Sequence, residues 1–144
     1  MKRLVLSLLC LFTLTVVAAR QKIRVMTGIE VLNAEHFKSL EGKRVGLITN
    51  PTGVDNQLRS TIDILAAAPN VRLVALYGPE HGVRGNAHAG DAVTDAKDAV
   101  TGLPVFSLFG KTRKPTADML KDIDVLVYDI QDIGCRSFTY ISTM

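Results

Sequence analysis

The sequence predicts a three-layer α/β domain built on a parallel, doubly wound sheet. Four short apolar runs alternate with helical or loop segments, and each run is typical of a strand buried on both faces. Each run ends in a turn with polar residues, in the sequences TNPTG, YGPEHG, LFGKT and YDIQDIG. The carboxyl ends of parallel strands lie along one edge of a sheet, where ligands bind, so we expect these polar residues to converge there.

Residues 1–19 are predicted to be a secretory signal peptide. Lys2 and Arg3 precede an apolar run that is too short for a membrane span, and the sequence Val17-Ala18-Ala19 is typical of a cleavage site. We therefore expect an exported protein, periplasmic or extracellular, whose folded part is residues 20–144. Loss of Lys2 and Arg3 takes the formal charge from +3 to +1, and there is no basic tract. Nucleic acid is therefore not a predicted partner.

The first half of the folded part is expected to contain two helices and two strands. Apolar residues lie on one helical face over Gly28–Leu40, and the first strand is Arg44–Thr49. A second helix, capped by Ser60 or Thr61, is expected to run to Ala68. The second strand, Val71–Leu76, follows at once.

The second half begins with residues 85–102, which are rich in Ala, Gly and Asp and predict a long loop over the site. The next strands are Pro104–Leu108 and Asp124–Ile130, with a short helix over Ala117–Lys121 between them. Residues Arg136–Met144 look like the start of another helix. The chain is therefore expected to be the N-terminal part of a longer protein.

The motifs of nucleotide sites are absent from this sequence. It contains no Gly-x-x-x-x-Gly-Lys-Ser/Thr, and Gly78, Gly82 and Gly85 do not have the spacing Gly-x-Gly-x-x-Gly. Neither a nucleotide nor any other cofactor is therefore predicted.

Metal and thiol chemistry are also weakly supported. Glu80, His81, His88 and Asp91 lie close in sequence but match none of the usual zinc spacings, so no metal site is predicted. Cys135 is the single cysteine after residue 19. A nucleophilic thiol is the alternative to our interpretation of Cys135 as a small buried apolar residue.

Glu80 is the best candidate for an acid or base, because it directly follows a predicted buried strand. The alternative is a turn residue that only accepts hydrogen bonds. His81 is expected to orient a substrate or to share a proton with Glu80, although an ordinary hydrogen-bonded histidine fits equally well. Asp129 and Asp132 are candidates for a second carboxylate facing Glu80, or else they fix a turn and cap a helix. Arg84, Arg113 and Arg136 are candidates to grip an anionic group of a substrate, or to neutralise nearby acids.

The sequence resembles the exo-β-N-acetylmuramidase family, formerly classed as a domain of unknown function. The resemblance covers the chain from Gly28 onward and is carried by four blocks in the right order: GIEVLNAEHFKSLEGKRVGLITNPTGVD, LYGPEHGVRGNAHAG, GLPVFSLFGKTRKPT and DIDVLVYDIQDIGCRSFTYISTM. It implies a Rossmann-like N-terminal domain of an exported bacterial protein, with a second, C-terminal domain beyond this chain.

The resemblance also implies an activity, the release of N-acetylmuramic acid from the non-reducing ends of peptidoglycan fragments. The GPEHG block of the family falls on Gly78–Gly82, so the resemblance implies that Glu80 is the catalytic carboxylate. From their places in the sequence, and not from the resemblance, we expect His81 and Asp129 to take part in catalysis beside it. From their places at the sheet edge we expect substrate contacts from a further set of residues: Asn50, Arg84, Gln131, Asp132, Arg136 and Tyr140. The alternative function is a non-catalytic module that binds peptidoglycan.

Overall fold

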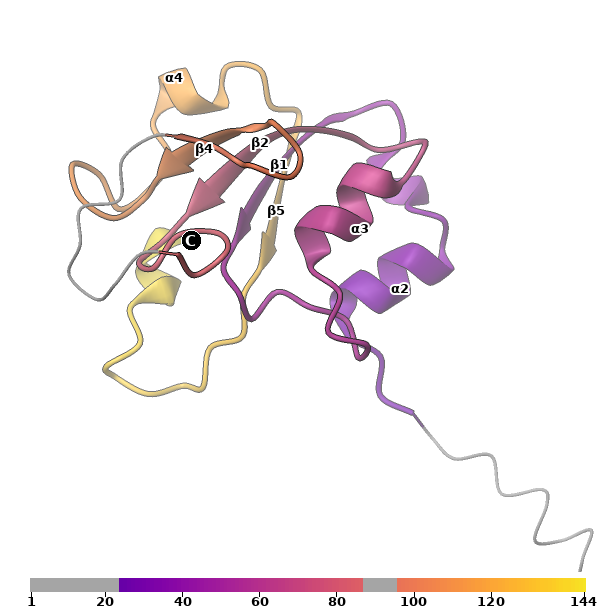
Figure 1. Cartoon of the computed structure of the whole chain (residues 1–144), viewed down its shortest axis with the longest axis horizontal. Coiled ribbons are helices and arrows are strands. Elements are labelled where there is room, and N and C mark those ends of the chain that lie inside the picture. The colour runs from indigo at the N-terminus through magenta and orange to yellow at the C-terminus, as the bar shows by residue number, and fades with distance from the viewer. Residues whose placement is uncertain (1–23, 87–95) are drawn as a thin grey trace, which may run out of the picture.

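The structure is a computed structural model that describes residues 24–86 and 96–144. The predicted signal peptide lies outside these ranges, as do His88 and Asp91. Within the described ranges, no helix is long and apolar enough to cross a membrane. Figure 1 shows a central sheet, with α2 and α3 at its side and α4 beyond the opposite strands.

The sheet contains the four predicted strands and one short strand that was not predicted. In chain order the strands are β1 (Arg44–Thr49), β2 (Arg72–Gly78), β3 (Ala96–Lys97), β4 (Pro104–Ser107) and β5 (Val125–Asp129). Their order across the sheet is β3-β4-β2-β1-β5. The four predicted strands pair in parallel, as expected. β3 pairs antiparallel with β4 and lies within the segment that was predicted to be wholly loop. It was not predicted because a strand of two residues leaves no periodic signal in the sequence.

The order of the strands creates a topological switch between β1 and β5. From β1 the chain passes through α3 (Thr61–Ala67) to β2, out to β3 at the edge of the sheet and back to β4, all on one side of β1. It then returns through α4 (Ala117–Leu120) to β5, on the other side of β1. In open α/β sheets, the carboxyl ends of the strands at such a reversal line a crevice for ligands.

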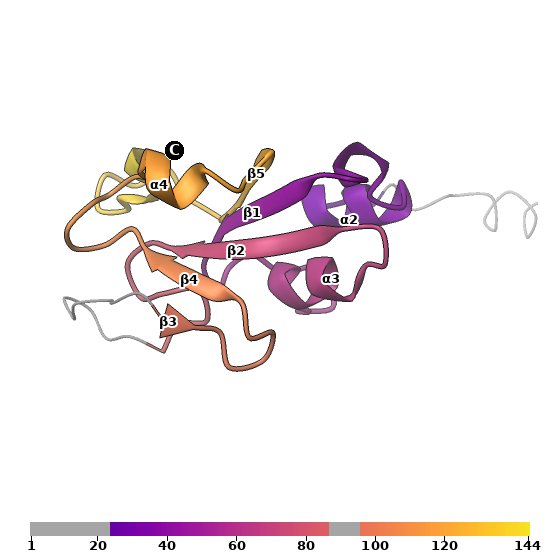
Figure 2. The ribbon, with the colours of Figure 1, turned by 90° about the horizontal axis from the view of Figure 1, so that it is seen from above.

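Helices cover both faces of the sheet, which confirms the three layers (Figure 2). On one face, α2 (Gly28–Ala34), the 3₁₀ helix η1 (Lys38–Leu40) and α3 share a core with β1 and β2. On the other face, Met119 and Leu120 of α4 pack against a second cluster. That cluster is made of Ile48, Ala75, Tyr77 and Leu108.

The predicted helix over Gly28–Leu40 is broken in the structure. His36 and Phe37 have φ values of 53° and 52°, which end α2 before η1 begins. The expected apolar face is nevertheless kept, because Phe37 and Leu40 are buried with Ile29 in one core. The capping predictions hold for α3, where the Ser60 hydroxyl accepts from the Ile62 N–H. At the chain's end only a short 3₁₀ helix forms, η2 (Tyr140–Thr143).

A glycine in the middle of β1 makes room for an aromatic ring. A Cβ atom on Gly46 would lie 2.8 Å from Cε2 of Tyr77 on the neighbouring strand. The Tyr77 ring is fully buried, and its hydroxyl donates to the Met119 carbonyl at 2.6 Å. Burial raises the pKa of Tyr77 to about 12. The ring therefore ties α4 to the centre of the sheet.

Candidate functional site

Glu80 and His81 form the middle of a tight turn that directly follows β2. The turn is closed by a hydrogen bond of 3.0 Å from the Gly82 N–H to the Pro79 carbonyl. His81, its third residue, has φ 73°, a left-handed conformation that usually requires glycine or asparagine and is the mark of a type II turn. Strained backbone of this kind is concentrated at functional sites.

The turn is packed so tightly that its shape is fixed. A Cβ atom on Gly78 would lie 3.1 Å from the Val83 nitrogen and 3.2 Å from the Gly82 Cα. A Cβ on Gly85 would lie 2.7 Å from Cγ of Pro51, in the loop that follows β1. The loops at the carboxyl ends of β1 and β2 are therefore in direct contact, as the sheet-edge prediction requires.

A small pocket opens beside Glu80. Its walls come from the ends of β2 and β4, from the loop before α4, and from the segment around η2: Pro79, Glu80, Leu108, Phe109, Arg113, Thr139, Ser142 and Thr143. The cavity measures about 10 Å³, room for about one water molecule. A sugar ring would therefore lie across the mouth of the pocket and not inside it.

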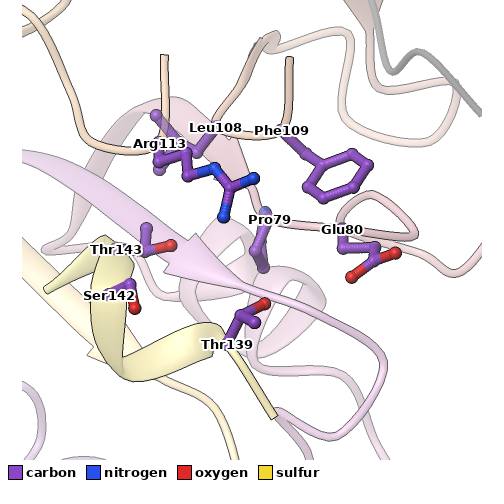
Figure 3. A pocket seen from close by; sticks show the side chains of 8 residues that line it. All are labelled: Pro79, Glu80, Leu108, Phe109, Arg113, Thr139, Ser142 and Thr143. Carbon is purple, nitrogen blue, oxygen red and sulfur yellow. The ribbon is translucent and has the colours of Figure 1, made fainter. Parts of the chain in front are cut away.

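Two opposite charges face this pocket without neutralising each other. Figure 3 shows the Arg113 guanidinium projecting into the pocket, the Glu80 carboxylate to one side of it below the Phe109 ring, and the Thr139 and Ser142 hydroxyls beneath the guanidinium. In the described part of the chain, neither the Glu80 nor the Arg113 side chain takes part in an ion pair. Both charged groups are thus available to a ligand.

Arg113 was only one of three candidate arginines in the sequence, and Phe109, Thr139 and Ser142 were not singled out. No spacing in the sequence connects them with Glu80. The connection comes from strand pairing, since β2 and β4 are neighbours and their carboxyl ends are level at Gly78 and Ser107. A correct pairing of the predicted strands is the signal that would have found Arg113.

Asn50 holds the loop after β1 instead of facing the pocket. It is buried, and its Oδ1 accepts from the Thr52 N–H at 2.9 Å and from the Thr52 hydroxyl at 2.6 Å. The Thr52 hydroxyl oxygen in turn accepts from the Gln131 N–H at 2.8 Å. Two of the predicted substrate contacts, Asn50 and Gln131, are therefore brought together at the switch between β1 and β5.

Asp129 does not face Glu80, contrary to our expectation. Its carboxylate accepts a hydrogen bond from the hydroxyl of Thr61, the first residue of α3. Glu80 shares its pocket with Leu108, which belongs to the core on the opposite face of the sheet. The reason is the alternation of side chains along β5, which places Asp129 on the same face as Val127, against α2 and α3.

The Arg84 guanidinium forms ion pairs with two aspartates. Its guanidinium donates to Asp98, which follows β3, at 2.6 and 3.0 Å, and to Asp63 of α3 at 2.8 and 3.3 Å. Arg84 thus anchors the chain just after the Glu80 turn to two other elements. A grip on a substrate anion, as predicted, would require this guanidinium to give up these partners.

The ion pair between Arg84 and Asp98 is expected to be a main determinant of stability in acid. The Arg84 guanidinium, helped by hydrogen bonds from Thr101, holds the pKa of the buried Asp98 carboxyl well below its usual range. The pair therefore stabilises the fold fully above the unfolded pKa of about 3.9, and this stabilisation is lost as the pH falls further. We expect Asp98→Asn to lower the free energy of unfolding at pH 7 by about 3 kcal/mol, since it leaves Arg84 without its buried partner.

Urea unfolding at several pH values measures this effect. Asp63→Asn is the matched control, because Asp63 contacts the same guanidinium from an exposed position and is expected to change stability by about 1 kcal/mol or less. The difference between Asp98→Asn and the native chain should shrink steadily as the pH falls from about 4 towards the lowered folded pKa of Asp98. Equal losses at pH 7 for Asp63→Asn and Asp98→Asn would contradict the assignment.

The remaining predicted residues lie along the segment between β5 and η2. Asp132 is exposed and its carboxylate accepts from the Gly134 N–H, which fixes a turn; Arg136 is also exposed. Tyr140 supports β5, since its carbonyl accepts from the Tyr128 hydroxyl at 3.0 Å. Cys135 is exposed, so our interpretation of it as a buried apolar residue is wrong. It lies in a loop, where no strand or helix carries its side chain into a core.

Metal-binding residues do not gather in the described ranges. No three His, Cys, Asp or Glu side chains there come close enough together to hold a metal ion. Glu80 and His81 are described, whereas the other two residues that were weighed for a metal site, His88 and Asp91, fall in the range 87–95 outside them.

The fold and the site together define a doubly wound α/β protein, with parallel strands in the order β4-β2-β1-β5 and a charged pocket at their carboxyl edge. The chain belongs to the family described as "Exo-beta-N-acetylmuramidase NamZ, N-terminal", which matches residues 45–144. The predicted resemblance is therefore confirmed.

One relative is similar to this chain in sequence, and two others are similar in both sequence and structure. A Bacillus subtilis (strain 168) protein named peptidoglycan beta-N-acetylmuramidase NamZ is 56% identical over 124 residues, which are 86% of this chain. Crystal structures of two DUF1343 family proteins from Bacteroides fragilis NCTC 9343 match with TM-scores of 0.76 and 0.64, at 76% and 38% identity over 84% and 83% of this chain. The matched part is 30% of the length of each of these three proteins.

Proposed function

We propose that this chain supplies the acid-bearing part of an exo-acting glycoside hydrolase that releases N-acetylmuramic acid from the non-reducing ends of peptidoglycan fragments. The observation that carries the proposal is the pocket in which Glu80 and Arg113 lie as opposite charges, neither of them in an ion pair with any residue that the structure describes. Membership of the family, and the name of the Bacillus subtilis relative, support the substrate class.

In this proposal, Glu80 acts as the general acid. Its protonated carboxyl donates a proton to the glycosidic oxygen while the bond from that oxygen to the anomeric carbon breaks, and the sugar develops oxocarbenium character. The fixed turn holds the carboxyl at the mouth of the pocket, so little reorganisation is needed during the reaction. His81, whose left-handed backbone shapes the turn, positions Glu80.

Arg113 is proposed to recognise what distinguishes muramic acid from other amino sugars, its lactyl carboxylate. A guanidinium binds a carboxylate through two parallel hydrogen bonds, which gives both charge and geometry. Arg113 projects into the pocket that holds Glu80, whereas Arg84 is held by Asp63 and Asp98. Arg113 thus replaces Arg84 as the arginine that the structure favours for this role.

Arg113→Gln is expected to raise KM for a muramic acid glycoside by about 10- to 100-fold, because charge-assisted hydrogen bonds of about 1.5–3 kcal/mol are lost. The corresponding N-acetylglucosamine glycoside has no lactyl group, so its weaker turnover should change little. Arg136→Gln is the matched control, since Arg136 is exposed and outside the pocket. A larger effect of Arg136→Gln would restore the original prediction for Arg136 and remove Arg113 from the site.

The activity itself is tested with a chromogenic N-acetylmuramic acid glycoside. Because the matched part is 30% of the relative, the assay compares this chain with a chimera in which residues 24–144 replace the matching segment of the Bacillus subtilis protein. Release of the chromophore by the chimera supports the hydrolase. Retention of the chimera on peptidoglycan without release would favour the non-catalytic binding module instead.

Export is part of the same proposal. The pattern of residues 1–19, basic then apolar then Val17-Ala18-Ala19, supports removal of a signal peptide and a site of action outside the cytoplasm, where peptidoglycan lies. Mass spectrometry of the protein from a bacterial host tests it, with a mature N-terminus at Arg20 as the expected result.

A further inference from the structure

Phe109 is a large apolar side chain that lies outside both cores of the fold. It is half-buried, and it belongs to neither of the two apolar clusters that pack on the faces of the sheet. Within residues 24–86 and 96–144, the aromatic pairs are Tyr77 with Phe106 and Phe138 with Tyr140, so no other ring packs on that of Phe109. An aromatic ring that lines a pocket beside a few polar groups is typical of a binding site.

The turn after β4 fixes the position of this ring relative to Glu80. The Ser107 hydroxyl accepts from the Phe109 N–H at 3.2 Å and donates to the Phe109 carbonyl at 3.0 Å, which closes the turn. Leu108 is 2% exposed, and its N–H donates at 2.8 Å to the carbonyl of Gly78, where the Glu80 turn begins. The turns after β2 and β4 are therefore joined through their backbones, and Phe109 and Glu80 line the same pocket.

The mouth of this pocket has a polar part and an apolar part. The polar part is the Arg113 guanidinium with the Thr139 and Ser142 hydroxyls beneath it (Figure 3). To one side of that guanidinium, the Phe109 ring lies above the Glu80 carboxylate. Because the cavity of about 10 Å³ cannot take in a sugar ring, a saccharide that lies across the mouth meets both parts. Guanidinium and hydroxyl groups suit a carboxylate and sugar hydroxyls, whereas a flat aromatic ring suits the C–H face of a pyranose.

We infer that Phe109 is the surface on which the sugar on the leaving-group side of the scissile bond stacks. The inference rests on the proposed function, in which Arg113 holds the N-acetylmuramic acid unit and Glu80 protonates the glycosidic oxygen. That oxygen lies between two sugar units, so the ring above Glu80 contacts the unit that departs. Stacking removes the apolar faces of both rings from water, and it fixes the angle at which the glycosidic oxygen meets the Glu80 carboxyl.

Binding to an inactive protein tests this inference without using activity as the readout. The protein is the chimera described above with Glu80→Gln. One ligand is the disaccharide in which N-acetylmuramic acid is β-linked to N-acetylglucosamine, and the other is the methyl β-glycoside of N-acetylmuramic acid, which lacks the second sugar. Adding Phe109→Ala is expected to raise Kd for the disaccharide about tenfold, the affinity that burial of about 50 Å² of apolar surface provides, and to change Kd for the methyl glycoside less than about twofold. Calorimetric titration measures both constants.

A matched control and two conservative variants accompany this measurement. Phe138→Ala is the control, because Phe138 is 37% exposed and does not line the pocket, so neither Kd should change. Phe109→Tyr keeps the flat ring and should keep the native affinity. Phe109→Leu keeps most of the apolar volume but not the flat face, and it should show the same selective loss even if a thermal melt finds Phe109→Ala less stable.

Three results would overturn the inference. Equal losses for both ligands would place Phe109 against the N-acetylmuramic acid unit itself. An unchanged Kd for the disaccharide in Phe109→Ala would leave the ring without a role in binding, as would a lack of disaccharide binding before Phe109 is changed.

The outcomes for Phe109 are distinct from those for the proposed function. Chromophore release by the chimera with its native Glu80, together with unchanged disaccharide binding in Phe109→Ala, would overturn the stacking role and keep the hydrolase. A selective loss of disaccharide affinity in a chimera whose native form releases no chromophore would keep the stacking role and support the non-catalytic binding module.

Discussion

Replacement of Glu80 by glutamine is expected to lower kcat of the chimera on the muramic acid glycoside by about 100-fold or more, within the usual contribution of a general acid. Glutamine keeps the size and polarity of the side chain but has no proton to give to the leaving oxygen. The fold should be unaffected, because the Glu80 side chain lines a pocket and forms no ion pair within residues 24–86 and 96–144. Initial rates and a thermal melt of the same sample measure both parts of this result.

Glu41→Gln is the control for that experiment. Glu41 is exposed in the turn that precedes β1, at the opposite end of the strand from the pocket, and its replacement should leave the rate unchanged. If Glu80→Gln retains nearly full activity with an unchanged melt, Glu80 is only a turn residue and the acid lies elsewhere. If the rate falls together with stability, the comparison of KM and kcat at a lower temperature separates lost folding from lost chemistry.

The second large effect is expected at Gly53, where Gly53→Ala should lower the free energy of unfolding by about 3 kcal/mol. A Cβ atom there would lie 2.2 Å from the Thr49 hydroxyl and 2.7 Å from the Asp129 carbonyl. These two groups are hydrogen-bonded to each other at 2.8 Å, between β1 and the end of β5. The added methyl group must therefore separate the two strands at the topological switch.

Gly28→Ala is the matched control for this substitution. Gly28 is the first residue of α2, and a Cβ atom there meets nothing within 4 Å. Because alanine favours the helix over glycine, this control should raise stability, by about 1 kcal/mol at most. The urea concentrations at the midpoint of unfolding are compared for the two variants and the native chain. A Gly53→Ala midpoint within error of the native one would mean that the loop after β1 changes its conformation without separating the strands.

The strands could be predicted from the sequence because each apolar run is local and ends in a clear turn. All four predicted strands are present. The turns after β2 and β4 line the pocket, and the turns after β1 and β5 form the network at the switch. The break in the first helix was not predicted because it depends on left-handed backbone conformations at His36 and Phe37. Histidine and phenylalanine rarely adopt this conformation, so the sequence gives no sign of it.

The candidate site was predictable only in part, because a sheet edge fixes which loops meet but not which way each side chain points. Glu80 lines a pocket at the predicted edge of the sheet. The side chain of Asp129 instead lies on the opposite face of the sheet, because side chains alternate between faces along β5. Arg84 and Arg113 were equivalent in the sequence. The structure distinguishes them, because Asp63 and Asp98, which are distant in sequence, form ion pairs with the Arg84 guanidinium and not with that of Arg113.

The contact between Gly46 and Tyr77 constrains how this chain can change over generations. Any side chain at position 46 would collide with the ring, so a first mutation there is harmful as long as Tyr77 is present. Loss of the ring alone would leave a void in the core and remove the hydrogen bond to Met119. The two positions are therefore coupled: a larger residue at position 46 fits only after the ring at position 77 has been replaced, and that replacement alone already lowers stability.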